Sequence, residues 1–202
     1  GVALPVPVWA LALMLSRRGL ACEICEQAMH SFEVGVGMNL LPQAVSELAE
    51  LGMLPDLDAV AIRTRELVYL SRRGQEVWRE PRGRAAGNEV PQFSIHRGHL
   101  HGVLRNAVER ELGAHAVRHG HRLAAFRQTG DLVHADLADR RGERIAAAAG
   151  DVMVGADGIH SAVRAALYPR EGPPCWNGVM IWRGCAGWPQ FLDRRSMILG
   201  GG

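Results

Sequence analysis

The chain has 202 residues, of which 48% are hydrophobic, 22% are charged and 5% are aromatic. This length predicts one domain, or one domain and part of another, with enough apolar residues for a buried core, so a disordered chain is excluded. Twenty-three basic residues against 21 acidic ones give a net charge of +2. No long run of one sign occurs, which argues against a nucleic-acid partner or a polybasic membrane partner. Every basic residue is arginine, which excludes a Schiff-base or P-loop lysine.

The N-terminal segment 2–15 is an uninterrupted apolar run that contains two prolines. A transmembrane helix needs about 20 apolar residues, so this run is too short to span a membrane. A signal peptide carries its charge before the apolar core, whereas Arg17 and Arg18 follow this one. The chain begins with glycine rather than methionine and ends in three glycines. We therefore expect a fragment that is incomplete at both ends.

The first half of the chain alternates between helical and extended patterns. Residues 9–18 form an Ala- and Leu-rich helix pattern that is followed by a glycine, and residues 21–25 predict a strand. Residues 42–51 predict a second helix, with proline in its first turn and apolar residues on one side. Residues 66–71 and 75–79 predict two strands of a hairpin around an Arg-Arg-Gly turn.

The middle of the chain contains a long amphipathic pattern followed by short extended segments. Ser94 is expected to cap a helix that ends at Leu112, because apolar residues recur there at helical spacing. Residues 118–126, 132–137 and 144–148 predict short strands with glycine turns between them.

The last part of the chain predicts a buried strand over 151–154, a Gly-Ala-Asp-Gly turn, and a helix over 161–167. A further strand is expected over 178–183. Alternation of strands and helices around a group of hairpins is typical of an α/β nucleotide-binding domain that carries a sheet insertion.

Two clusters of possible metal ligands favour a structural interpretation. Cys22 and Cys25 have CxxC spacing, but in a strand their sulfurs point to opposite faces, so we expect reduced thiols in a cytoplasmic protein. His96 and His99 could share a helix face, but His101 points away from both, and no acidic partner is close in sequence. No metal site is therefore expected. There is also no GxSxG elbow, and no pair of carboxylates that would indicate a hydrolase.

The strongest local signal is the pattern DxxVGADGxxSxVR, which covers residues 151–164. An apolar strand there brings Asp157 and Gly158 into a tight turn before a helix. Glycine allows a ligand to approach the backbone, the aspartate can accept hydrogen bonds from a ribose or from nearby amides, and a helix N-terminus favours a phosphate. The competing interpretation is an ordinary Asp-Gly turn.

Glu26 is the second signal, because it follows the strand predicted over 21–25. An acidic residue at the end of the second strand of a βαβ unit is the usual ligand of a ribose hydroxyl. Taken alone, an acidic residue at a strand end is more often simply solvated.

With these motifs, the chain resembles the FAD-dependent aromatic monooxygenases of the para-hydroxybenzoate and salicylate hydroxylase type, over residues 10 to about 199. Within that family it is most similar to the phenazine-biosynthesis branch, the 5-methylphenazine-1-carboxylate hydroxylase type. The segments that carry the resemblance are GVGMNLLPQAVSELAELG (35–52), EPRGRAAGN (80–88), PQFSIHRGHL (91–100), VGADGIHSAVR (154–164) and MIWRG (180–184).

The resemblance implies a Rossmann-like FAD-binding domain of the glutathione-reductase type with an inserted β-sheet substrate domain, both truncated. Residues 1–60 and 94–172 would belong to the FAD-binding domain, and residues 61–93 and 173–202 would begin the substrate domain.

The resemblance also implies a set of cofactor-binding residues. An acid binds the ribose, glycines lie where the chain passes the flavin, an arginine reaches the cofactor from the long helix, and the Asp-Gly turn approaches the pyrophosphate and ribose and influences NAD(P)H use. An arginine on the first substrate-domain strand is a candidate for substrate contact. In this sequence the cofactor set is Glu26, Gly35, Gly37, Arg97, Gly155, Asp157, Gly158 and Arg164, and the substrate candidate is Arg183.

The activity implied by the resemblance is hydroxylation of a small aromatic substrate of the phenazine carboxylate type. In the family, NAD(P)H reduces FAD, O₂ adds to give a flavin C4a-hydroperoxide, and one oxygen atom passes to the ring. The cofactor carries the reactive chemistry, so no side-chain nucleophile is required.

The sequence departs from the family at its N-terminus, where Ala3, Pro5 and Val8 occupy the positions of the GxGxxG glycines. Those glycines give the tight turn next to the pyrophosphate, and prolines remove backbone donors. The family's first β-strand is absent, and a reading-frame error is one explanation. Two alternatives therefore stay open: a non-catalytic fragment or pseudoenzyme, and another FAD-dependent oxidoreductase on the same fold.

Overall fold

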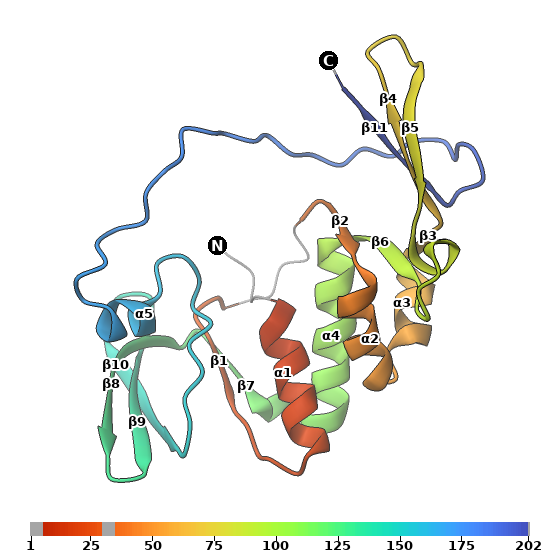
Figure 1. The fold of residues 1–202 in the computed structure, drawn as a ribbon. Helices are drawn as coiled ribbons and strands as arrows, with labels where there is room; N and C mark the ends of the chain where they lie inside the picture. The colour runs from red at the N-terminus through yellow and green to blue at the C-terminus, as the bar shows by residue number, and fades with distance from the viewer. Residues whose placement is uncertain (1–5, 30–34, 202) are drawn as a thin grey trace. The chain divides into compact units, whose positions relative to one another are not determined.

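The computed structural model describes residues 6–29 and 35–201, which form two compact units (Figure 1). One unit comprises residues 6–29 and 104–182, and the other comprises residues 35–103 and 183–201. The division falls inside one long helix, between Val103 and Leu104. The domain boundaries that the family resemblance implies stay a prediction.

The first unit begins with helix α1 (Val6–Arg17), as the Ala- and Leu-rich pattern predicts. The helix buries Trp9, Ala12 and Leu13, and the following glycine, Gly19, has a φ of 71°, a conformation that residues with a side chain rarely adopt. Strand β1 (Ile24–Glu26) then pairs in parallel with β7 (Val117–His119), which places Glu26 opposite His119.

An antiparallel meander completes the sheet structure of the first unit. Strands β8 (Arg122–Thr129), β9 (Leu132–Ala138) and β10 (Arg144–Gly150) lie in the order β10-β9-β8. The predicted turns between them are confirmed by Gly130 and Gly142, whose φ values are 59° and 85°. Short helix α5 (Ala162–Leu167) follows the meander, and 3₁₀ helix η2 (Ala114–Ala116) precedes β7.

The second unit contains an antiparallel sheet of order β2-β6-β3, formed by β2 (Gly37–Leu40), β6 (Gln92–His96) and β3 (Ile62–Thr64). Helix α2 (Pro42–Glu50) confirms the predicted second helix, and α3 (Leu54–Val60) and 3₁₀ helix η1 (Gly83–Ala86) were not predicted. The core of this unit is apolar and includes side chains of both helices and of β6: Val45, Leu48, Leu57, Phe93 and Ile95.

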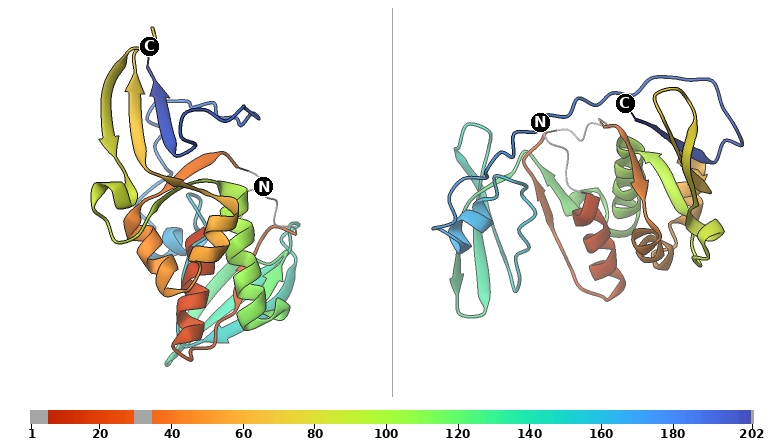
Figure 2. Two further views of the ribbon diagram at one scale, coloured as in Figure 1. Left: turned by 90° about the vertical axis from the view of Figure 1, so that its right-hand side faces the viewer. Right: turned by 45° about the horizontal axis from the view of Figure 1, so that its top comes forward.

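A second sheet in this unit confirms the predicted hairpin. Strands β4 (Glu66–Leu70) and β5 (Glu76–Pro81) pair antiparallel, and β11 (Ser196–Gly200) pairs in parallel with the other edge of β4. Figure 2 shows the dark blue β11 beside the yellow hairpin. The sequence pattern did not predict β11.

Helix α4 (Arg97–Leu112) confirms the predicted long helix, but its predicted start at Ser94 is wrong. Ser94 lies inside β6, where its hydroxyl donates to Asn39 Oδ1 at 2.9 Å and lies 2.7 Å from Thr64 Oγ1. A hydroxyl that bridges strands in this way is not available to cap the helix.

Three predicted strands differ in the structure. Residues 118–126 are divided between β7 and β8, because Gly120 turns the chain with a φ of 76°. Residues 151–154 and 178–183 form no strand. Val152 is 79% exposed and Trp182 is 89% exposed, and no strand of the described residues pairs with either segment. Apolar residues alone are therefore not enough to form a strand in these segments, because a strand needs a neighbouring strand with which it can form hydrogen bonds.

In the part of the chain that the structure describes, no helix has the length and hydropathy needed to cross a membrane. The apolar N-terminal pattern instead contributes the buried face of α1.

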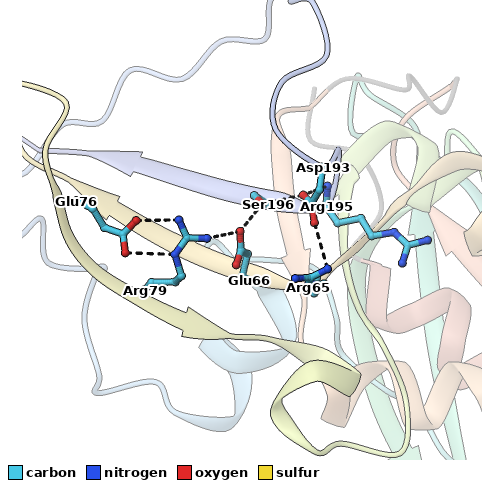
Figure 3. Close-up of polar contacts among 7 residues, drawn as sticks. All are labelled: Arg65, Glu66, Glu76, Arg79, Asp193, Arg195 and Ser196. Atoms are coloured by element: carbon cyan, nitrogen blue, oxygen red, sulfur yellow. Dashed lines mark hydrogen bonds and ion pairs between the residues drawn. The ribbon is translucent and has the colours of Figure 1, made fainter.

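A polar cluster fastens β11 to the hairpin (Figure 3). Ser196 Oγ lies 2.6 Å from Oε1 of Glu66 and 2.8 Å from Oδ1 of Asp193. Glu66 also accepts from Arg79 at 2.7 Å, and Arg79 in turn binds Glu76. The Ser196 hydroxyl and Arg79 lower the pKa of Glu66. The Arg195 amide and the Ser196 hydroxyl lower the pKa of Asp193.

We expect acid to loosen β11. A carboxylate whose pKa is lowered in the folded chain stabilises the fold at neutral pH, and this contribution is lost as the pH falls through the folded-state pKa. Glu66→Gln should have a similar effect at pH 7 because it removes the charge that pairs with Arg79. Hydrogen exchange of the β11 amides, corrected for intrinsic rates, measures this loosening. Glu143→Gln, on an exposed turn, is the control, and equal protection in both variants would contradict a role for the cluster.

Candidate functional site

Glu26 lies at the end of β1, where the sequence analysis expected a ribose-binding acid. Its side chain is only 5% exposed, and Oε1 accepts a hydrogen bond of 2.6 Å from the backbone N–H of Ala28. Burial raises the pKa of Glu26, while the Ala28 amide and nearby His119 oppose this shift. A buried carboxylate that one backbone amide holds at a strand end can accept hydrogen bonds from the hydroxyl groups of a ribose.

Three of the predicted residues come together where β2 meets the start of α4. A Cβ at Gly35 would lie 2.7 Å from Arg97 Cβ, so only glycine permits the observed approach. The Arg97 amide donates to Val36 O at 3.1 Å, and Gly37 pairs with His96 across the β2–β6 ladder. The guanidinium of Arg97 is on an exposed side chain, available to an anionic group.

His96 is a site residue that the sequence analysis missed, since it weighed this side chain only as a metal ligand. The Gly98 amide donates to Nδ1 of His96 at 3.2 Å, so Nε2 carries the proton and donates to Gly35 O at 2.9 Å. The ring therefore fixes the glycine loop against the start of α4. Its position directly before Arg97 was the only available signal.

The Asp-Gly turn is held by its own side chains. Asp157 Oδ2 accepts from the amides of Ala162 at 2.6 Å and Val163 at 3.4 Å, and Oδ1 accepts from the Ser161 hydroxyl. Burial tends to raise the pKa of Asp157, but the hydrogen bonds from Ser161 and Ala162 outweigh it and lower the pKa. Ser161, the N-cap of α5, belongs to the motif of residues 151–164, but the sequence analysis did not count it among the site residues.

The two glycines of this turn have distinct structural reasons. Gly158 has a φ of 83°, in the left-handed region that favours glycine. A Cβ at Gly155 would lie 2.7–2.8 Å from three side-chain atoms of Val163, so glycine is needed for the loop to pack against α5. The loop is thus closely packed at Gly155, whereas nothing lies within 4 Å of the Cβ position at Gly158.

The remaining predicted residues do not join these groups. Arg164 forms a two-point ion pair with Glu171, with Nε 2.6 Å from Oε2. Arg183 lies in an exposed segment with no helix or strand. Val8 lies within α1, and Ala3 and Pro5 lie outside the described residues.

The cysteine and histidine clusters show no metal-site geometry. Cys22 precedes β1 and Cys25 lies in it, both as free thiols, and burial, followed by the charge of Glu23, raises the pKa of Cys25 to about 11. His96 and His99 have ring centroids 5.2 Å apart, and His101 is buried in α4. Among the residues with described positions, no group of three His, Cys, Asp or Glu side chains could hold a metal ion.

Each unit contains residues of a kind that bind one part of a dinucleotide cofactor. One unit supplies a buried acid and a glycine turn, and the other supplies a glycine loop against an exposed arginine. Such features suit ribose hydroxyls, close backbone approach and an anionic diphosphate respectively.

Comparison with known protein families decides the assignment. A family model described as an FAD binding domain matches residues 9–177, most of the chain. The chain belongs to this FAD-binding family. The predicted FAD-binding fold and the family resemblance are thereby confirmed.

Curated relatives agree with this assignment. Phenazine 1,6-dicarboxylic acid hydroxylase of Lysobacter antibioticus is 42% identical over 191 residues, which cover 93% of this chain and 47% of that protein. The aurachin C monooxygenase/isomerase of Stigmatella aurantiaca is 33% identical over 86% of this chain and 43% of that protein. The chain thus spans less than half the length of these relatives.

Solved structures share the fold of this family member. The flavin-dependent monooxygenase PieE, in complex with FAD and substrate, has a TM-score of 0.67 at 22% identity, covering 82% of this chain and 32% of that one. HpxO of Klebsiella pneumoniae, complexed with FAD and uric acid, has a TM-score of 0.65 at 22% identity, covering 81% and 40%.

Replacing Gly155 tests the packing of the loop. Gly155→Ala should lower the free energy of unfolding of this region by about 1–3 kcal/mol, because its Cβ would overlap Val163. The second change Val163→Ala should restore part of this loss by removing the opposing methyl groups. Thermal unfolding measures both effects. Gly184→Ala is the control, because nothing lies within 4 Å of its Cβ. A Gly155→Ala variant as stable as the control would show that the loop does not pack this way.

Proposed function

We propose that the chain is the FAD-binding part of a flavin-dependent monooxygenase that hydroxylates an aromatic, phenazine carboxylate-like substrate. The observation that carries this proposal is the 42% identity with a phenazine 1,6-dicarboxylic acid hydroxylase across 93% of the chain. Other relatives are also named monooxygenases of aromatic compounds, including a 3-amino-4-hydroxybenzoate 2-monooxygenase of Streptomyces cremeus.

The proposed cofactor contacts rest on the family resemblance and on the local geometry within each unit. Glu26 accepts hydrogen bonds from the ribose hydroxyls in the adenosine part of FAD, since its carboxylate is buried at a strand end. Arg97 offers its exposed guanidinium to the diphosphate, and at Gly37 nothing lies within 4 Å of the Cβ position, so the backbone there is open to a ligand. Gly155 and Gly158 allow a second backbone approach. The assignment of Arg164 and Arg183 rests on the family resemblance alone.

FAD, when bound, would supply the redox chemistry of a monooxygenase, in which NAD(P)H is the two-electron reductant, one oxygen atom of O₂ enters the product and the other leaves as water. In this proposal the residues of the chain bind and orient the cofactor and the substrate. The proposed location is the cytoplasm, as the sequence analysis expected.

An FAD titration of the 202-residue chain, followed by flavin fluorescence, tests this proposal. We expect saturable binding that Glu26→Gln weakens by about tenfold or more, because a charge-assisted hydrogen bond is lost. Glu47→Gln, an exposed carboxylate of α2, is the control and should bind like the unmodified chain. No saturable binding would refute the proposal for this chain and favour the non-catalytic alternative.

The pH dependence of FAD binding gives a separate prediction. Because burial raises the pKa of Glu26, its carboxylate takes up a proton at a higher pH than an ordinary glutamate does. FAD affinity should therefore be complete at neutral pH and should fall as the pH decreases through this raised pKa. FAD titrations at pH values from about 7.5 down to about 4.5, the range in which a glutamate with a raised pKa becomes protonated, measure this fall. Glu26→Gln should remove it, and an unchanged profile in that variant would exclude Glu26 as the titrating ligand.

Product analysis distinguishes a monooxygenase from another FAD-dependent oxidoreductase. The 202-residue chain is incubated with FAD, NADPH and a phenazine carboxylate under ¹⁸O₂. We expect a hydroxylated phenazine whose new oxygen atom is ¹⁸O. NADPH consumption without this product would contradict the hydroxylase assignment and favour a reductase on the same fold.

A further inference from the structure

A small cavity in the second unit lies between the start of α2, the segment 80–88 and the first residue of β6. Its volume is about 200 Å³, and all of its lining residues belong to this one unit. The segment 80–88 carries part of the family resemblance, but the proposed cofactor contacts do not use it. The lining includes one cation and no acidic side chain, and four of its residues are apolar: Leu41, Pro42, Pro81 and Ala86.

Gln92 lines this cavity with a buried side chain that forms no hydrogen bond to the described residues. The residue is only 2% exposed. Ser94, two positions along β6 and therefore on the same face, differs because its hydroxyl lies 2.7 Å from that of Thr64. Neither polar atom of the Gln92 carboxamide has such a partner in the part of the chain that the structure describes. An unpartnered buried carboxamide costs free energy, which points to a group outside the fold that supplies the hydrogen bonds.

The first turn of α2 adds a backbone donor to the same cavity. The nine-residue helix begins with Pro42, which has no N–H, and no side chain caps it. The amides of Ala44 and Val45 both donate to Leu41 O at 3.0 Å. The amide of Gln43, which also lines the cavity, has no acceptor among the described residues. Because a helix N-terminus carries a partial positive charge, this free donor favours an anion.

The segment 80–88 forms a closely packed wall of the cavity. A Cβ at Gly83 would lie 2.4 Å from the backbone nitrogen of Gln92, and Asn88 Nδ2 donates to Gly83 O at 2.9 Å. Arg82 is the cation of the cavity, and its Nη2 binds the carboxylate of Glu80. The Nε of Arg82 has no hydrogen-bond partner in the described chain. Glu80 therefore offsets part of the positive charge that an anion in the cavity would meet.

We propose that this cavity binds a small carboxylate with a compact apolar body, of the size of benzoate. The Gln92 carboxamide and the Gln43 N–H donate to the carboxylate, Arg82 supplies the positive charge, and the apolar residues contact the body of the ligand. The ligand is small because the cavity is below the roughly 300–1,000 Å³ of sites for drug-sized molecules. Gln92 begins β6 whereas Arg97 follows its end, so the site is separate from the proposed cofactor contacts and does not depend on FAD.

Titration of the 202-residue chain with benzoate, without FAD, tests this inference in ¹H–¹⁵N NMR spectra. We expect saturable shifts of the Gln43 backbone amide and the Gln92 side-chain amide, with a Kd on the order of 1 mM. Gln92→Met keeps an unbranched side chain and removes both polar atoms. It should weaken binding about tenfold, because a hydrogen bond to a charged group is lost. Gln75→Met, at an exposed position of the same unit, is the matched control.

The same two variants measure the cost of the buried carboxamide. Without ligand, Gln92→Met should raise the midpoint of thermal unfolding by about 2–4 °C, because an unpartnered polar group is removed from a buried position. Gln75→Met should leave the midpoint unchanged. A lower midpoint in Gln92→Met together with unchanged benzoate affinity would mean that Gln92 serves only the fold, and would overturn the inference.

Changes of charge test the role of Arg82. Arg82→Gln should weaken benzoate binding by about two- to fivefold. Glu80→Gln should strengthen it by a similar factor, because the guanidinium is released from its carboxylate partner. Arg84→Gln removes an exposed neighbouring cation outside the cavity lining, and this control should bind like the unmodified chain.

Two further probes separate a carboxylate site from other kinds of site. Benzamide has the shape of benzoate without its charge, and inorganic phosphate has charge without an apolar body, so both should bind at least about fivefold more weakly. Equal affinity for either probe would overturn the carboxylate assignment. Absence of a saturable shift at Gln43, or unchanged affinity in Gln92→Met, would overturn the site itself. Failure of the FAD titration alone would refute the proposed function and leave this inference standing.

Discussion

Backbone hydrogen bonding between neighbouring strands is the constraint on which the rest of this structure depends. A strand leaves its N–H and C=O groups unsatisfied unless another strand lies beside it. Where a partner exists, even a three-residue segment such as β1 is ordered, and its end places Glu26 in a buried position. Where the described chain provides none, as at residues 151–154, an apolar sequence stays exposed and irregular. Sheet membership, more than local composition, therefore determines which predicted strands form.

The local patterns predicted most of the helices and hairpins, because their signals lie within a few residues. Proline at the start of α2 and glycine after α1 are such signals, and the β4–β5 hairpin follows from its turn. Except for the split of residues 118–126 at Gly120, the errors in the predicted strands and in the start of α4 have a common cause in distant partners. Serine is a residue type that commonly caps helices, but Ser94 lies in β6. This strand forms because β2 and β3, which are distant in sequence, pair with it on both sides. For the same reason, β11 could not be recognised from its own five residues.

In the candidate site, too, the residues that carry a local motif were predicted, whereas the residues that act through contacts with other segments were not. Motif matching identified Glu26, Gly35 and Arg97, and the structure gives physical reasons for the position of each, including the approach of 2.7 Å that a Cβ at Gly35 would make to Arg97. The sequence could not reveal His96 and Ser161 as supporting residues, because their roles lie in hydrogen bonds to the loops beside them. The motif residues of this chain also fix the conformation of their own loops. The spacing of a motif therefore reflects how its loop folds as well as what the loop binds.

The parallel pairing of β11 with β4 has a consequence for synthesis of the chain. Ser196 and Glu66 are 130 positions apart, yet they share a hydrogen bond in the finished sheet. At typical translation rates of about 5–20 residues per second, the ribosome needs roughly 6 to 26 s to add the intervening residues. For most of that interval, once Pro81 has been added, both strands of the hairpin exist while one edge of β4 still lacks its neighbour. An unpaired edge of this kind can pair with another chain, so the nascent hairpin is exposed to aggregation until β11 has been made.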